Sequence, residues 1–243
     1  KPADLARADA FVRAARTSKV KVLMHISDPD LRRNKGRLPS VKQYRSSVGK
    51  LVKRYRALGV SEWGVWNEAN HDSQATYRNP KRAAQFFVAM RSLCKGCTIV
   101  ALDVLDQARA TTWVRQWYAA VPRSQRRFAK VVGIHNYSDT NRFSQTRTKK
   151  IIKAIGGSSE IWLLETGGQL KLGKTTFGEA KAAKALKCMF AIAKNPRIKR
   201  AYIYQFNGDR PDANFDAGLI GPDGTTKRKG YDVVRKRTSK GGC

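Results

Sequence analysis

Acidic residues are scarce in this sequence. The 243 residues include 18 Asp and Glu against 49 Lys and Arg, which gives a formal net charge of +31 at pH 7. The positive electrostatic potential of such a protein attracts polyanions of any kind, so the charge does not identify a specific partner. The basic residues are spread along the whole chain, and only 227–240 is dense enough to form a patch. Nucleic-acid-binding proteins usually concentrate their charge and interleave aromatic residues, so we predict no specific nucleic-acid partner.

Long apolar runs and linkers are also missing. No run approaches the ~18 residues of a spanning helix, so we predict no membrane span. No Pro/Gly/Ser-rich stretch divides the chain, so we expect one domain over 1–243. Disorder is excluded because the five Trp, eight Tyr and nine Phe require a core. The chain begins at Lys1, without Met or the hydrophobic region of a signal peptide, so we expect a segment upstream.

Motifs for cofactors and metals are missing as well. No GxGxxG or GxxxxGK[ST] occurs, and the three His form neither HxH nor HExxH spacing. We therefore predict no cofactor and no metal site.

The four cysteines are Cys94, Cys97, Cys188 and Cys243. The first two form a CxxC pair, but the second pair of a zinc site is missing. A thioredoxin-type motif would open a helix after a strand, whereas this pair follows a predicted helix. An even number of cysteines in an exported protein indicates disulfides. We predict the pairs Cys94–Cys97 and Cys188–Cys243, and an extracellular location.

Helical and strand patterns alternate along the chain. Apolar residues at helical spacing predict helices over 4–17, 41–58, 80–94, 111–121, 145–155, 176–194 and 227–237. Short apolar, β-branched runs predict strands over 20–26, 62–67, 98–104, 131–136, 160–165 and 200–206. Alternating βα units form a parallel sheet, which is either doubly wound or closed into a barrel.

Polar residues near the ends of the predicted strands favour the barrel. They are His25, Asn67, Glu68, Asp103, His135, Tyr137, Glu165 and Gln205. Barrel enzymes build their active sites at the C-terminal ends of the strands. A doubly wound nucleotide-binding sheet would need a glycine-rich turn after an early strand, and none is present. The sequence therefore predicts an α/β fold of the (β/α)8 TIM-barrel type, with six strands in this chain.

Glu68 and Glu165 each end an apolar strand. They are 97 residues apart, about three βα units. In a closed eight-stranded barrel, strands at this interval face each other obliquely across the mouth, so the two carboxylates could approach to ~5 Å, the separation in retaining glycosidases. The alternative is that each is a salt-bridged acid at a strand end, which so basic a protein easily satisfies. The spacing leaves both interpretations open.

Several segments resemble one family. WGVWNEAN resembles the strand-4 motif of the clan A retaining β-glycosidases, which are TIM barrels, and IWLLETGG resembles strand 7. VVGIHNYSD resembles strand 6, and ADAFVRAARTSKVKVLMHISD resembles helix 2 and strand 3. The xylosidase-like family 39 barrels are the most similar. The resemblance implies that the six strands are strands 3–8, so we expect the domain to be N-terminally incomplete, lacking strands 1 and 2.

The resemblance also implies roles for individual residues. Glu68 matches the general acid/base and Glu165 the nucleophile. The remaining positions imply substrate contacts by His25, Asn67, His135, Tyr137, Tyr204 and Gln205. Asn67 would bond the sugar 2-hydroxyl, and Tyr137 would steady the nucleophile. Ala69 stands where the family motif has Pro, and the family's strand-8 Trp is missing, so Tyr204 or Phe206 would serve as the sugar platform.

The predicted function is hydrolysis of an oligo- or polysaccharide by a retaining β-glycosidase. The charge is compatible with an acidic glycan, although no residue specifies one. The alternative is a non-catalytic carbohydrate- or polyanion-binding barrel, and the presence of both glutamates argues against it.

Overall fold

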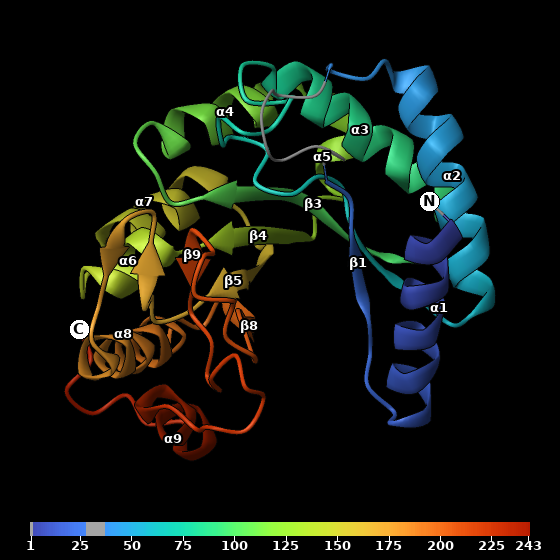
Figure 1. Cartoon of the computed structure of the whole chain (residues 1–243). Coiled ribbons are helices and arrows are strands. Elements are labelled where there is room, and N and C mark those ends of the chain that lie inside the picture. Colours follow the sequence, from blue (N-terminus) through green and yellow to red (C-terminus); the bar gives the residue numbers. More distant parts are fainter. Residues whose placement is uncertain (1, 28–36) are drawn as a thin grey trace. The chain divides into compact units, whose positions relative to one another are not determined.

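The computed structural model describes residues 2–27 and 37–243. The chain divides into two compact units, the first within 1–104 and 113–132 and the second comprising 105–112 and 133–243. Strands alternate with helices through both units (Figure 1). The larger strands follow chain order, β1-β2-β3 in the first unit and β4-β5-β8 in the second. This order is the one that consecutive βα units produce.

The first unit is built on three parallel strands and their helices. Its strands are β1 (Leu23–His25), β2 (Glu62–Gly64) and β3 (Thr98–Leu105). Its helices are α1 (Pro2–Thr17), α2 (Val41–Ala57), α3 (Pro80–Leu93), α4 (Ala110–Ala120) and α5 (Arg123–Arg126). Leu23 lies opposite Glu62, which lies opposite Thr98, so the three strands begin at one level.

Local sequence signals begin the helices of the first unit. Ser40 caps α2 and forms a reciprocal capping box with Gln43. Asn79 caps α3, and Pro80 occupies the first turn, where its missing N–H costs nothing. Behind the strands, Phe86 of α3 stacks on Tyr44 of α2, with ring centroids 4.3 Å apart. Both rings are buried, so the two helices share one aromatic core.

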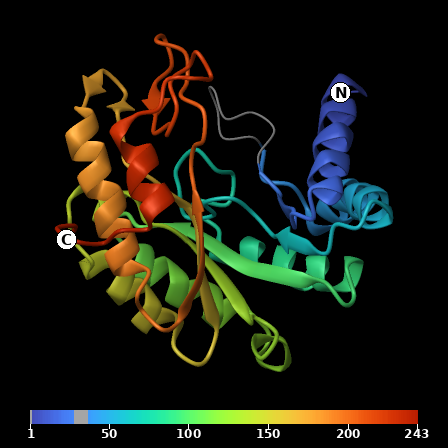
Figure 2. The ribbon, with the colours of Figure 1, turned by 90° about the horizontal axis from the view of Figure 1, so that it is seen from below.

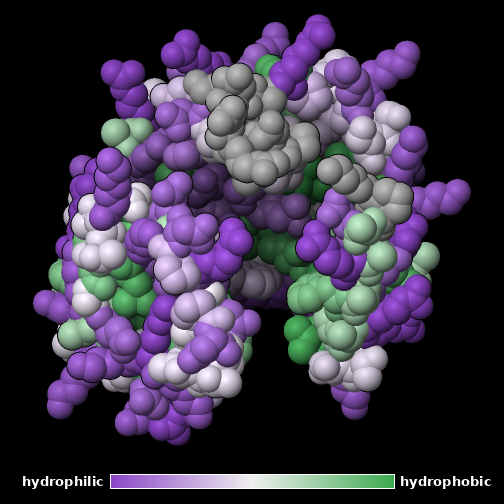
Figure 3. Space-filling model, in the orientation of Figure 1, coloured by the Kyte–Doolittle hydropathy of each residue, from purple (hydrophilic) through white to green (hydrophobic). Residues whose placement is uncertain are grey.

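Two large apolar side chains of the first unit are exposed. Phe11 on α1 is 65% exposed and Val20, before β1, is 60% exposed. Figure 3 shows hydrophobic side chains in this region of an otherwise largely hydrophilic face. The hydrophilic remainder agrees with the high content of Lys and Arg.

The second unit combines parallel strands with a small antiparallel sheet. Its larger strands are β4 (Val131–His135), β5 (Glu160–Thr166) and β8 (Ile198–Ile203). Its helices are α6 (Tyr137–Asn141), α7 (Thr146–Ile155), α8 (Glu179–Ile192) and α9 (Lys229–Lys236). The small sheet contains β6 (Lys171–Leu172), β7 (Thr175–Thr176) and β9 (Phe215–Asp216). Helices α8 and α9 lie side by side in both ribbon views (Figure 1, Figure 2).

A partly buried ion pair holds the long segment between β8 and α9. The Arg228 guanidinium donates two hydrogen bonds to the Asp216 carboxylate, at 2.8 and 2.9 Å. Burial opposes ionisation of Asp216, but hydrogen bonds from Arg228 and the Gly218 N–H outweigh it and lower the pKa of the carboxyl group. The pair therefore ties β9 to the start of α9.

The predicted elements are present, with bounds that differ by a few residues. Strand β2 ends at Gly64 rather than at residue 67 because the chain turns there to form the loop that carries Glu68. Helix α8 begins at Glu179 rather than at 176 because β7 occupies 175–176. The short helices α5 and α6 and the small sheet were not predicted. Elements of two to five residues show too little periodicity to be recognised. The single domain over 1–243 stays a prediction.

Both predicted disulfides are present. Cys94–Cys97 closes the turn between α3 and β3, and Cys188–Cys243 joins α8 to the last residue. Within the described ranges, no helix combines the length and the apolar character needed to cross a bilayer.

Removal of the two disulfides is expected to have unequal effects. Cys188–Cys243 spans 55 residues and Cys94–Cys97 spans three. In the chain-entropy account, the longer loop contributes about 4 kcal/mol to the free energy of unfolding and the shorter about 2 kcal/mol. The double variant Cys188→Ala/Cys243→Ala should therefore lose about twice as much stability as Cys94→Ala/Cys97→Ala in denaturant titrations. Equal losses would contradict this account, and thiol titration of the unfolded wild type should find no free thiol.

Candidate active site

The predicted site residues fall into two groups, one in each unit. His25, Asn67 and Glu68 lie in the first unit. His135, Tyr137, Glu165, Tyr204 and Gln205 lie in the second. The members of each group lie at or just beyond the C-terminal ends of their unit's strands, where the sequence predicted them.

Glu68 has an unusual backbone conformation. Its φ of +40° lies in the left-handed region, which residues other than glycine rarely adopt. Its N–H donates to Asp103 Oδ2 at 3.1 Å, and its carbonyl accepts from the His71 N–H at 2.7 Å. The next N–H, of Ala69, donates to the Asp103 carbonyl at 3.0 Å. These bonds hold a turn that is costly in isolation, at the position of the candidate acid/base.

Asp103 also contacts His25. His25 Nε2 lies 3.8 Å from Asp103 Oδ2, and the Asp103 side chain is 1% exposed. The imidazole lies across the backbone of Gly64, where an added Cβ would be 2.1 Å from His25 Cδ2. Only glycine at 64 leaves room for the ring, so this residue determines where His25 lies.

The loop after Glu68 is held by several further bonds. The Asn67 N–H donates to the Ile26 carbonyl at 2.7 Å, which joins the loop to the segment after β1. Trp66 Nε1 donates to Gln74 Oε1 at 3.0 Å, and the Thr76 hydroxyl donates to the Ala69 carbonyl at 2.9 Å. The loop from Trp66 to Thr76 is therefore cross-linked by its own side chains.

Glu165 lies beside two side chains, one from the last residue of β4 and one from the first residue of α6. The Tyr137 hydroxyl donates to Glu165 Oε2 at 3.3 Å, and His135 Nδ1 lies 3.6 Å from the same oxygen. His135 is fully buried, whereas the Glu165 side chain is 32% exposed. The carboxylate is thus restrained from the protein side and reachable from solvent.

Helix α6, which begins with Tyr137, is anchored against the end of β5. The hydroxyls of Thr140 and Thr166 lie 3.3 Å apart. Asn141 Nδ2 donates to the Gly167 carbonyl at 2.9 Å, and its Oδ1 accepts from the Gln169 N–H at 2.8 Å. These bonds hold α6 to the residues that directly follow Glu165.

An aromatic cluster lies on the same side of the second unit. The ring centroid of Phe215 lies 5.5 Å from that of Tyr137 and 5.9 Å from that of Tyr204. Burial, together with the negative charges of Glu165 and Asp209, raises the pKa of the Tyr204 hydroxyl, so it stays a donor. The cluster gives Glu165 an apolar border.

The end of β8 carries the other two predicted residues of this unit. The Tyr204 carbonyl approaches Gly167 so closely that a Cβ there would be 2.2 Å from its oxygen. The Tyr204–Gln205 peptide bond is cis, and Gln205 Nε2 donates to Asp209 Oδ2 at 3.1 Å. Phe206, the alternative sugar platform, is 59% exposed.

Some residues around the candidate site were not assigned from the sequence. Asp103 was noted at a strand end but given no role. The buried Asp106 and Asp139 and the aromatic Phe215 were not singled out near the site, because they follow no strand pattern that marks them. No group of three or more His, Cys, Asp or Glu in the described part of the chain could hold a metal ion.

Comparison with known proteins reveals similarity in fold but not in sequence. No sequence family and no curated protein sequence matches the chain. The solved glucosidase from Croceicoccus marinus has a TM-score of 0.65 over 89% of this chain, at 14% identity. A family 39 glycoside hydrolase from Bacteroides cellulosilyticus WH2 has a TM-score of 0.62 over 95%, at 16% identity. A family 10 xylanase from Thermobacillus composti has a TM-score of 0.65 over 94%, at 13% identity.

These similarities confirm the predicted fold. The chain is an α/β protein of TIM-barrel type, similar in fold to clan A glycoside hydrolases. It spans 50% of the glucosidase and 52% of the family 39 enzyme, and 80% of the xylanase. Identities this low show the fold alone.

The packing of His25 on Gly64 can be tested by substitution. Gly64→Ala places a methyl carbon 2.1–2.6 Å from three ring atoms of His25, so the ring or the strand must move. Such overpacking costs about 1–3 kcal/mol of the free energy of unfolding. We expect denaturant titration to show this loss, and the double variant Gly64→Ala/His25→Ala to be more stable than Gly64→Ala alone. No recovery in the double variant would contradict the contact.

Proposed function

We propose that this chain forms the catalytic domain of a retaining β-glycosidase acting on an oligo- or polysaccharide. Glu165 attacks the anomeric carbon while Glu68 protonates the leaving oxygen, and a glycosyl-enzyme forms. Glu68 then removes a proton from water, which releases the sugar with its anomeric configuration retained. The observation that carries the proposal is the pair of carboxylates, each at or just beyond the C-terminal end of a parallel strand, in a fold shared with glycoside hydrolases.

The surroundings of Glu165 suit a nucleophile. A hydroxyl donor favours the ionised form of a carboxylate, and Tyr137 supplies one at 3.3 Å. His135 adds positive charge beside the same oxygen when it is protonated. The bond from Tyr137 also limits rotation of the carboxylate, which favours a fixed line of attack.

The surroundings of Glu68 suit an acid/base held by its backbone. Asp103 accepts the Glu68 N–H at 3.1 Å, which restrains the backbone at the position of the candidate acid/base. Asn67 directly precedes Glu68, in the place from which the family resemblance implies a contact to the sugar 2-hydroxyl.

The solved neighbours, two exposed aromatic rings, the net charge and the disulfides support proposals about substrate and location. Solved neighbours include a β-1,4-mannanase and an endo-β-1,4-xylanase, which supports a β-linked polysaccharide substrate. Tyr204 is 41% exposed and Phe206 is 59% exposed, so either ring can stack on a sugar face. The net charge of +31 is compatible with an acidic glycan, and two disulfides support an extracellular location.

A second candidate is a non-catalytic carbohydrate- or polyanion-binding barrel, which the net charge favours. In that case the protein binds a glycan or polyanion but releases no product. Substitution of either glutamate would then leave product formation at the background rate.

Substitution of the two glutamates is expected to give different defects. Glu165→Gln removes the attacking group, so hydrolysis of every aryl glycoside should fall on the order of 10²-fold or more. Glu68→Ala should still form the glycosyl-enzyme from a substrate with an activated leaving group, and this intermediate should accumulate. Added azide needs no general base, so it should restore turnover of Glu68→Ala and give a β-glycosyl azide.

The matched control is Glu160→Gln, at the opposite end of β5 from Glu165. It removes one carboxylate from the same strand and should keep the wild-type rate. Wild-type rates in both Glu165→Gln and Glu68→Ala would contradict the assignment. An inverted product from the wild type would contradict the retaining mechanism only.

A further inference from the structure

Asp106, which directly follows β3, is a fully buried carboxylate outside the proposed reaction. It accepts the N–H of Ser138 at 2.9 Å and the N–H of Asp139 at 2.7 Å. These donors belong to the first turn of α6, whose N–H groups have no partner within the helix. Asn136, at the N-cap position, makes no side-chain capping bond. Asp106 therefore supplies from another segment the cap that α6 lacks.

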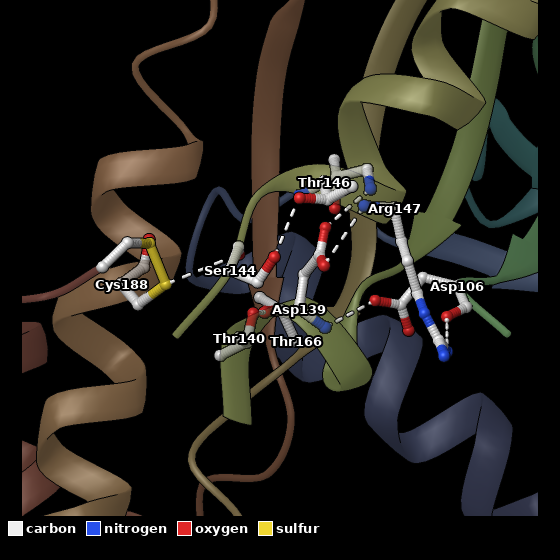
Figure 4. Close-up of a disulfide and its surroundings, with 10 residues drawn as sticks. Asp106, Asp139, Thr140, Ser144, Thr146, Arg147, Thr166 and Cys188 are labelled. Carbon is white, nitrogen blue, oxygen red and sulfur yellow. Dashed lines mark hydrogen bonds between the residues drawn. A yellow bond between two sulfur atoms is a disulfide. The ribbon is translucent and has the colours of Figure 1, made fainter. Parts of the chain in front are cut away.

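The backbone of Asp106 also makes two hydrogen bonds. Its N–H donates to the His135 carbonyl at 2.9 Å, and Arg147 Nη1 donates to its carbonyl at 2.8 Å. Asp139 in turn accepts the N–H groups of Arg147 and Thr148, at 3.2 and 2.6 Å. Figure 4 shows Asp106, Asp139 and Arg147 converging between α6 and α7. The cap is thus part of a rigid network.

We propose that Asp106 is a positioning residue. It holds the first turn of α6 so that the Tyr137 hydroxyl stays hydrogen-bonded to the Glu165 carboxylate. Tyr137 directly precedes the two residues whose N–H groups Asp106 binds. Helix α6 has five residues, too few to be stable by itself, so the place of its first residue depends on such anchors. The inference rests on the proposed function, because it gives Tyr137 and Glu165 their roles.

The protonation state of Asp106 should control the strength of the anchor. Burial raises the pKa of Asp106 to about 7, and the charge of Asp139 acts in the same direction. The two N–H donors and Arg147 oppose this shift. The His135 carbonyl accepts the Asp106 N–H, so His135 is a further titratable residue beside Asp106. Above this pKa both carboxylate oxygens accept; below it one oxygen carries a proton and binds its N–H less strongly.

The effect on stability has the opposite sign to the effect on the anchor. The pKa in the folded state lies above the ordinary 3.8 of the unfolded state, so the folded protein binds the proton more tightly. The contribution of Asp106 to the free energy of unfolding therefore falls as pH rises from about 4 to about 7. The hydrogen bonds that Asp106 accepts from α6 become stronger as pH rises through the upper part of the same range. Activity should therefore rise with pH while stability falls. If both fell as pH rises, another titrating group would be responsible.

The test compares kcat and KM of four proteins on an aryl glycoside between pH 5 and 9. Asp106→Asn keeps the shape but places an amide N–H₂ against a backbone N–H, so we expect kcat to fall about 10-fold with KM little changed. Tyr137→Phe should cause a similar fall. The double variant should be no slower than the slower single variant, because both remove the same contact. Asp106→Asn should also lose an ionisation near pH 7 that the wild type shows.

The matched control is Asp139→Asn, which removes equivalent bonds from α7 rather than from the turn after Tyr137. Its effect should add to that of Tyr137→Phe. It should keep the Asp106 ionisation, moved to a lower pH because the Asp139 charge that raises the pKa of Asp106 is removed. Additive losses in the Asp106→Asn/Tyr137→Phe variant, or an unchanged pH profile in Asp106→Asn, would overturn the proposal while leaving the proposed function intact.

A second measurement does not depend on activity. Amide hydrogen exchange at Ser138 and Asp139, corrected for the intrinsic pH dependence, should be faster in Asp106→Asn than in the wild type. In the wild type it should accelerate below pH 7. If the wild type hydrolyses no glycoside, the proposed function fails, and the exchange rates still decide whether Asp106 holds α6. Unchanged rates would overturn the proposal.

Discussion

Backbone N–H groups that leave a strand or begin a short helix must find an acceptor, and in this protein buried and partly buried aspartates supply it. The aspartates that accept such N–H groups are Asp103, Asp106, Asp139 and Asp216. They act in the turn of Glu68, at the start of α6, at the start of α7 and after β9. The segments that carry the candidate site therefore depend on carboxylates other than the two candidate glutamates.

This use of acidic residues bears on the charge of the whole protein. Only 18 acidic residues accompany 49 basic ones. The buried aspartates Asp103, Asp106 and Asp139 accept hydrogen bonds from backbone N–H groups. Ion pairs such as Arg7–Asp4 and Arg235–Asp232 join exposed neighbours on one helix, and such pairs contribute little to stability. The surface consequently stays strongly basic, and the Arg228–Asp216 pair is an exception in which charge pairing joins two elements.

Much of the fold could be predicted from the sequence, and less of the site. Alternating periodicity places the strands and the longer helices, and the polar residues at strand ends point to one edge. Helix α6 could not be predicted, because its stability comes from Asp106 and Thr166, which are distant in sequence. The contact of His25 with Gly64 also could not be recognised from the sequence, because a glycine in a strand has several explanations. Tertiary contacts, not local propensity, determine these features.

The two candidate glutamates are restrained in different ways, and the difference matches the chemistry required of each. Asp103 binds the backbone of Glu68 and holds its φ of +40°, which sets the direction of the side chain. Tyr137 binds the carboxylate of Glu165 itself. A nucleophile must keep its charge and its line of attack, so a donor on the carboxylate helps it. An acid/base must gain and lose a proton in one cycle, and the hydrogen bond to Asp103 restrains Glu68 through its backbone N–H rather than through its carboxyl group.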